Sequence, residues 1–69
     1  MIQVTIRFVD GSLQEFTETN EFLLRLSELK EQGYEGKGLI DSLITDDWGA
    51  PPVFVEIKGS EINLQIPYN

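Results

Sequence analysis

The residues best suited to chemistry gather near the middle of the chain. The segment ITDDWGAPP contains Thr45, Asp46 and Asp47, and Asp41 lies shortly before it. Hard cations such as Ca²⁺ prefer carboxylate and hydroxyl oxygens, so these residues would suit a small metal- or ligand-binding accessory subunit that uses the loop 41–48. The D-x-D-x-D-G spacing of an EF-hand is absent. The simpler interpretation is a solvated acidic loop in which an aspartate supports a turn, and we expect no metal site.

The composition leaves few groups for catalysis. The chain has no histidine and no cysteine, so the usual bases and nucleophiles reduce to carboxylates, Lys, Tyr, Ser and Thr. The serines lie in turn or helix-surface segments without the spacing of a nucleophile elbow. A chain of 69 residues also leaves little room for a pocket that would desolvate a carboxylate. We therefore expect no catalytic residue and no cofactor-binding residue, and the chain is predicted not to be an enzyme.

The charge balance is strongly acidic. Five Lys and Arg residues against twelve Asp and Glu residues give a formal net charge of −7. The basic residues are scattered singly, which argues against direct nucleic-acid binding because phosphate recognition needs a clustered basic surface. Net charge of this size favours solubility, and it also suits a protein partner with a basic surface. An inhibitor or nucleic-acid mimic would need one contiguous surface formed by Glu15, Glu18, Glu21, Asp41, Asp46 and Asp47.

The single tryptophan lies between two aspartates and the sequence Gly-Ala-Pro-Pro, and two interpretations stay open. In the first, its side chain folds back to close one end of the core, as a small domain requires of its large side chains. In the second, it anchors an interface, since Trp is enriched at binding hot spots. A phenylalanine in the following strand would face outward and enlarge the patch. The predicted partner-binding residues are Asp41, Asp46, Asp47, Trp48 and Phe54.

The elements that must position these residues follow from the spacing of apolar side chains. Residues 2–8 alternate between apolar and polar, which predicts a half-buried strand. The Asp-Gly dipeptide that follows predicts a hairpin, since both residues tolerate positive φ. In the return segment SLQEFTE, Leu13 and Phe16 are three positions apart, so a regular strand sends them to opposite faces. We expect a bulge to bring both inward; the alternative leaves Leu13 on the outer face with Val9.

The segment TNEFLLRLSELKEQGY switches to helical spacing. Phe22, Leu26 and Leu29 follow at i, i+4 and i+7, which predicts an amphipathic helix. Either residue of the opening Thr-Asn pair can supply the N-cap oxygen, and Gly33 suits the left-handed residue after the helix. The next segment, EGKGLIDSLIT, fits either a short second helix or an irregular buried stretch.

The C-terminal segment predicts a second hairpin. Its turn is expected at Gly59-Ser60 in a two-residue type II′ geometry. This placement brings apolar residues opposite one another on one face, together with one pair of opposite charge. The predicted pairs are Lys58 with Glu61, Ile57 with Ile62, Val55 with Leu64 and Val53 with Ile66.

Together these elements predict one α+β domain over residues 1–69. The order ββα(α)ββ favours a two-layer sandwich, with a four-stranded sheet and one main helix packed on one of its faces. If the first and last strands lie in the middle, the sheet order is 2-1-4-3. That layout resembles the β-grasp (ubiquitin-like) arrangement in topology. Strands two and three would then form the edges, where a partner strand or a second copy of the chain could add.

The resemblance is most useful for the functions that it excludes. Ubiquitin-like modifiers and sulfur carriers act through a C-terminal Gly-Gly, whereas this chain ends in IPYN. Plant-type ferredoxins of the same layout need four cysteines, and the chain has none. Neither activity is therefore expected.

The cellular location of the protein is predicted from the membrane-spanning and targeting segments that the sequence lacks. No apolar run approaches the roughly 20 residues of a membrane span. The opening MIQVTIRFVD alternates instead of forming the apolar region of a signal peptide. With the absence of cysteine, this predicts a cytoplasmic protein. The expected function is that of a small acidic protein–protein interaction module, with the accessory subunit described above or a structural homodimer as alternatives.

Overall fold

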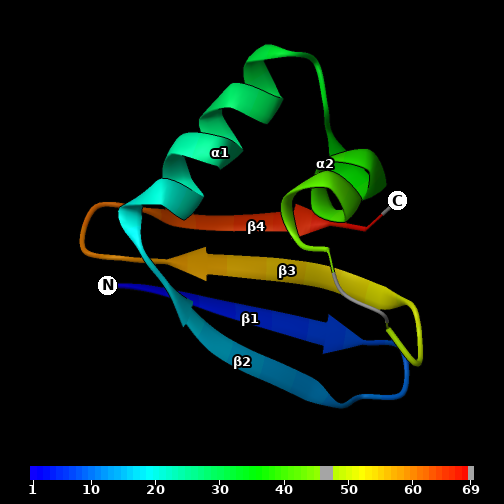
Figure 1. The fold of residues 1–69 in the computed structure, drawn as a ribbon. Helices are drawn as coiled ribbons and strands as arrows, with labels where there is room; N and C mark the ends of the chain where they lie inside the picture. The colour runs from blue at the N-terminus through cyan, green and yellow to red at the C-terminus, as the bar shows by residue number, and fades with distance from the viewer. Residues whose placement is uncertain (46–47, 69) are drawn as a thin grey trace.

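A computed structural model describes residues 1–45 and 48–68 of the chain. It contains a four-stranded antiparallel sheet and two helices (Figure 1). The predicted α+β class is thus confirmed, and the segment with two possible interpretations forms a second helix. The elements along the chain are β1 (Ile2–Phe8), β2 (Leu13–Glu18), α1 (Asn20–Glu31), α2 (Gly36–Leu43), β3 (Pro52–Lys58) and β4 (Asn63–Pro67).

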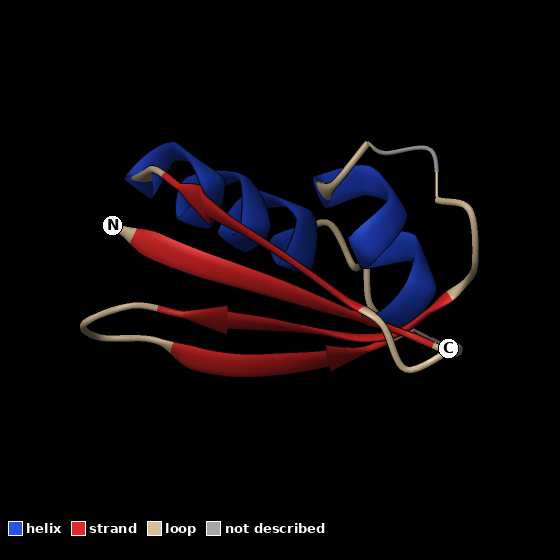
Figure 2. Ribbon diagram, turned by 90° about the horizontal axis from the view of Figure 1, so that it is seen from below, coloured by secondary structure: helices blue, strands red, loops and turns tan. Residues whose placement is uncertain are grey.

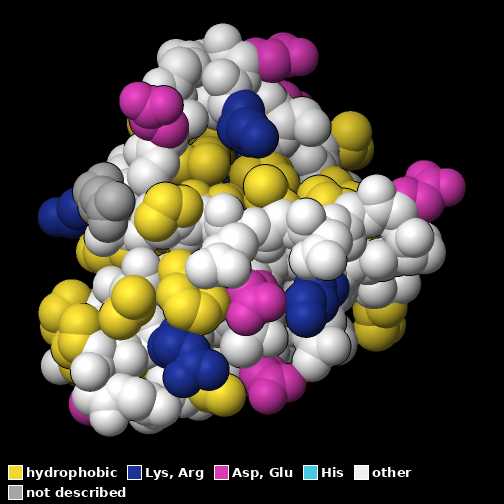
Figure 3. All heavy atoms as spheres, turned by 180° about the vertical axis from the view of Figure 1, so that it is seen from behind, with side chains coloured by type: hydrophobic (Ala, Val, Ile, Leu, Met, Phe, Trp, Pro, Cys, Tyr) yellow, Lys and Arg dark blue, Asp and Glu magenta, His cyan; other side chains and the backbone are white. Residues whose placement is uncertain are grey.

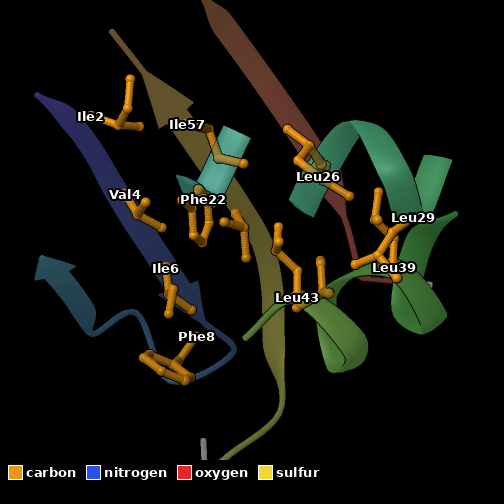
Figure 4. Close-up of a cluster of buried hydrophobic side chains, with 13 residues drawn as sticks. Ile2, Val4, Ile6, Phe8, Phe22, Leu26, Leu29, Leu39, Leu43 and Ile57 are labelled. Atoms are coloured by element: carbon orange, nitrogen blue, oxygen red, sulfur yellow. The ribbon is translucent and has the colours of Figure 1, made fainter. Parts of the chain in front are cut away.

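Both helices cover the same face of the sheet, which gives the protein two layers (Figure 2). The core fills the space between these layers (Figure 4). The predicted helical stripe of Phe22, Leu26 and Leu29 is buried there, because its spacing places all three on one side of α1. The side chains that are almost completely excluded from solvent are Val4, Ile6, Ile40, Val55 and Ile57.

The strand order is β2-β1-β3-β4, so the predicted order 2-1-4-3 is wrong and the grasp-like layout is not confirmed. β3 lies in the middle because its inward residues Val55 and Ile57 are completely buried. β4 buries only Ile66 fully and ends in Pro67, which has no N–H to donate and suits an edge. The two edges of the sheet are therefore β2 and β4.

The turn between β1 and β2 contains the predicted Asp-Gly pair. Gly11 has a φ of 88°, which a side chain would strain. The Phe8 N–H donates to the Ser12 carbonyl over 3.0 Å, and the Gly11 N–H donates to the Phe8 carbonyl over 3.0 Å. The register beyond this turn is unbroken, with Leu13 opposite Arg7. The expected bulge in β2 is therefore wrong, and Leu13 lies on the outer face.

A bulge is present instead in β3. Arg7 pairs with Phe54 while the next residue, Phe8, pairs with Pro52, so Val53 is the additional residue. The bulge turns Pro52 inward, where it is buried, and leaves Val53 42% exposed. The expectation that Val53 faces the core is wrong for this reason.

The β3–β4 hairpin forms with a register two residues away from the predicted one. Val55 pairs with Ile66 and Ile57 with Leu64. A shift of two keeps every side chain on its predicted face, so the apolar pattern is equally satisfied. Gly59 lacks the positive φ of the predicted type II′ turn. A Cβ on Gly59 would lie 2.7 Å from Ile2 Cδ1 and 3.1 Å from Ile62 Cγ2, so a larger residue would have to displace these side chains.

The ends of α1 are set by the residues that flank it. Thr19 is the N-cap residue of α1, although its side chain makes no capping hydrogen bond. At the other end, the Tyr34 N–H donates to the Leu29 carbonyl over 3.1 Å, as in a Schellman motif. Among the described residues, no helix is long and apolar enough to cross a membrane.

Candidate functional site

Trp48 packs against one end of the core. Its ring meets that of Phe8 edge-on, with 5.7 Å between the ring centroids, and Tyr68 lies tilted on it at 6.5 Å. The side chain is half-buried and touches the buried cluster from outside. Because Phe8 ends β1 and Tyr68 follows β4, the tryptophan holds two strand ends together. This packing supports the interpretation of Trp48 as a cover for the core.

Asp41 is engaged by the same group. The Tyr68 hydroxyl donates a hydrogen bond to Asp41 Oδ1 over 2.7 Å. That bond raises the pKa of Tyr68, and desolvation and the negative charge of Asp41 act in the same direction. The Lys37 Nζ lies 5.8 Å from the centroid of the Tyr68 ring, in cation–π range. The sequence prediction missed Tyr68 and Lys37, although Lys37 and Asp41 share one face of α2 through their i, i+4 spacing.

The predicted partner-binding residues do not all lie on one surface. Asp41 and Trp48 both contact Tyr68. Phe54 lies on the outer face of the sheet, where the Arg7 guanidinium carbon is 5.7 Å from its ring centroid. Trp48, by contrast, contacts the inner-face residue Phe8. The predicted residues 46–47 lie outside the described part of the chain.

The outer face of the sheet carries apolar side chains at one end, gathered around a basic residue (Figure 3). On this face Arg7 has Leu13 and Phe54 as its neighbours across the strands. The exposed Val53 belongs to the same end. The sequence prediction found only Phe54 here, because it placed Leu13 and Val53 on the inner face. The rest of this face is polar, as predicted.

A hollow of about 480 Å³ opens between the end of β2 and α1. It is lined by Glu18, Glu21 and Glu28, and Arg25 lies among them. Arg25 Nη2 donates to the Ser42 carbonyl over 3.0 Å, which directs the guanidinium toward α2. Three glutamates and one arginine therefore line the same hollow.

A second hollow of about 330 Å³ continues along the inner face of β2. It shares Glu18 and Leu43 with the first hollow, and we call the two together the β2 groove. The half-buried ring of Phe16 forms part of its lining. The groove exists because the helices pack mainly over the other strands. The other residues that line the second hollow are Gln14, Ile44 and Thr45.

The contiguous acidic surface that an inhibitor or nucleic-acid mimic would need is divided among the described residues. Glu18 and Glu21 meet in the β2 groove. Glu15 lies on the outer face, where its Oε2 accepts a hydrogen bond from Gln3 Nε2 over 2.7 Å. Asp41 is bound by Tyr68. The structure adds Glu28 to the groove, and the i, i+7 spacing from Glu21 could have revealed this from the sequence.

Within residues 1–45 and 48–68, no three His, Cys, Asp or Glu side chains come together as a metal site would require. Comparison of the chain with protein-family models, curated proteins and solved structures finds no match. The function must therefore be argued from the surface of the molecule itself.

Proposed function

We propose that the chain is a small, non-catalytic, cytoplasmic protein–protein interaction module that binds a basic surface on its partner. One observation carries this proposal: Glu18, Glu21 and Glu28 line the same open hollow. Glu18 lies at the end of β2, and Glu21 and Glu28 lie two turns apart on α1, so the fold fixes their relative positions. The proposal thus rests on three glutamates that line one hollow.

The electrostatic setting favours a cationic partner. Among the described residues, Lys58 and Glu56 form the one ion pair, with 3.5 Å between Nζ and Oε2. None of the three groove glutamates therefore forms an ion pair within that part of the chain, and Arg25 is the one basic residue that lines the same hollow. The net charge of −7 would also attract a basic protein at long range and speed its association. Exposed carboxylates of this kind contribute to recognition and association rate more than to affinity.

The exposure of the polar side chains favours binding over catalysis. The described residues bury no polar or charged side chain. Strongly shifted pKa values of catalytic groups depend on such desolvation. The groove is also an open surface, whereas substrate sites enclose most of their ligand. Both observations favour a partner that docks from outside.

The test compares two triple variants of equal charge. The first replaces the groove glutamates (Glu18→Gln, Glu21→Gln, Glu28→Gln), and the control replaces exposed glutamates elsewhere (Glu31→Gln, Glu35→Gln, Glu61→Gln). Each protein is immobilised and used to capture proteins from a lysate of its own cells at low salt, followed by elution with rising salt. We expect basic proteins bound by wild type and by the control to be lost by the groove variant. Equal capture by both variants, or binding that salt does not weaken, would refute the proposal.

A further inference from the structure

The edge of β2 that faces away from β1 is open to an added strand. What we infer from this edge rests on the proposed function, because it specifies which kind of basic segment the partner presents. β2 is six residues long, contains no proline and pairs only with β1 among the described strands. At the end of β1, the Phe8 N–H donates to the Ser12 carbonyl on the β2 side, while the next N–H, that of Val9, donates to the Pro51 carbonyl on the β3 side. Bonding directions alternate along antiparallel strands. Leu13, Glu15 and Thr17 therefore direct their backbone groups toward the open edge.

The opposite edge of the sheet is less suited to pairing. The Gly59 N–H donates to Ile62 and the Tyr68 N–H donates to Val53. By the same alternation, Asn63, Gln65 and Pro67 are the β4 residues that face outward. Pro67 cannot donate a hydrogen bond there. The two edges thus differ in the number of N–H groups that they offer to an added strand.

A strand added to β2 would place every second side chain over the β2 groove. Side chains alternate between the faces of a sheet, and Gln14, Phe16 and Glu18 are the β2 residues that line the groove. A basic side chain beside Phe16 would lay its apolar stem along a lining that includes Leu43 and Ile44. A basic side chain beside Glu18 would lie next to that glutamate, where the first hollow begins. The groove therefore favours Lys or Arg at the positions that face it, and the apolar residues of an alternating segment would lie on the outer face, beside Leu13.

The charge also decides between a different protein and a second copy of this chain. Two copies paired antiparallel through the middle of β2 would place Glu15 of one chain opposite Glu15 of the other. Like charges opposite one another on neighbouring strands are destabilising, and each chain carries −7. A basic segment removes this repulsion and replaces it with attraction.

We infer that the open edge of β2 binds an extended segment of a partner protein in which Lys or Arg residues alternate with apolar residues. The segment pairs with the backbone of Leu13, Glu15 and Thr17. Its groove-facing side chains lie over Phe16 and Glu18. This mode of binding gives affinity through main-chain hydrogen bonds and specificity through alternate side chains.

The test uses a short synthetic peptide in which lysine and valine alternate, with a peptide of the same composition in separate blocks as control. Thr17→Pro removes one outward N–H of β2, and Gln65→Pro makes the matching change on β4. Neither residue donates within the sheet, so both variants should fold, which thermal unfolding checks. We expect Thr17→Pro to weaken binding of the alternating peptide about fivefold to tenfold. Gln65→Pro should bind it as wild type does, and the block peptide should bind more weakly.

A second measurement needs no substitution. Addition of the alternating peptide to the full wild-type chain should slow amide hydrogen exchange at Leu13, Glu15 and Thr17, and leave Asn63 and Gln65 unchanged. Unchanged exchange at β2, with equal affinity for both peptides, would overturn the strand-pairing inference. The proposed function would survive that result if binding still weakened in salt and in the groove-glutamate variant. A doubling of mass in solution that Thr17→Pro abolishes would identify a second copy as the occupant and would also overturn the inference.

Discussion

The hydroxyl of Tyr68 donates a 2.7 Å hydrogen bond to the carboxylate of Asp41, 27 positions earlier in the chain. This bond joins the residue after β4 to the exposed side of α2. The ring of Tyr68 also lies against Trp48 of the predicted binding loop, so Asp41, Trp48 and Tyr68 form one cluster. A change at any of the three residues should therefore affect the other two.

The first prediction concerns the ionisation of Tyr68. Because Asp41 raises the pKa of Tyr68 above its ordinary value of 10.0, the protonated phenol is favoured in the folded state. The protonated phenol of Tyr68 contributes fully to stability at pH values below that ordinary pKa. The contribution is lost as the pH rises through the raised pKa of Tyr68. In a Tyr34→Phe background, where one phenol titrates, Asp41→Ala should lower the pKa of Tyr68 toward 10.0. Glu61→Ala, an equal change of charge in the β3–β4 turn, should leave it unchanged in an ultraviolet titration.

The second prediction concerns the role of Trp48. Removal of its ring exposes Phe8 and loses an edge-on aromatic contact, so Trp48→Ala should lower the free energy of unfolding by about 2 kcal/mol. Leu24→Ala, at a side chain that is 64% exposed, should change it by less than about 0.5 kcal/mol. Denaturant unfolding measures both. Unchanged stability of Trp48→Ala together with loss of the captured basic partner would instead make the loop the binding surface.

The third prediction concerns the space beside Gly59. Gly59→Ala places a methyl group against Ile2 Cδ1 and should destabilise the protein by about 1–2 kcal/mol. Gly49→Ala is the matched control, because a Cβ there meets nothing within 4 Å. Ile2→Val removes the Cδ1 atom, so the double variant should be more stable than the sum of the two single changes predicts. Strict additivity would show that Ile2 does not limit the space.

The fourth prediction concerns the β1–β2 turn. Both the hydroxyl and the backbone N–H of Ser12 donate to Asp10 Oδ1, and these bonds lower the pKa of Asp10. These bonds therefore stabilise the turn fully at pH values above 3.8, the ordinary pKa of an aspartate. Their contribution is lost as the pH falls through the lowered pKa of Asp10. Ser12→Ala should raise the pKa of Asp10 part of the way back, since the backbone donor remains. An NMR titration of the Asp10 carboxyl measures the change, and an unaltered value would contradict it.

The sequence predicted β1 and α1 most directly because each has a clear period. The alternation of residues 2–8 and the helical stripe from Phe22 to Leu29 each identify one buried face, and both are found. The order of the strands was harder to predict, because β3 and β4 both present an apolar face. Only their relative burial decides which of them is central. The hairpin register failed for a related reason: a shift by two residues leaves Val55 and Ile57 on the same face.

The candidate site was harder to predict than the fold. The β2 groove depends on how far the helices reach across the sheet, which no local pattern specifies. Its glutamates come from a strand end and from two turns of a helix, so their proximity is a tertiary property. Phe54 was correctly expected on the outer face, but its neighbours Leu13 and Val53 were missed because a turn and a bulge determine where they point.

The strand order also governs how the chain folds. The β1–β2 and β3–β4 ladders join neighbours in sequence, whereas the β1–β3 ladder joins residues such as Ile6 and Val55, whose positions differ by 55 − 6 = 49. Closing a longer loop costs more chain entropy, and folding slows as contacting residues lie farther apart in sequence. Isolated hairpins form within about 1–10 μs. We therefore expect the meeting of the two hairpins along β1 and β3, with α1 and α2 closing over them, to be the step that sets the folding rate.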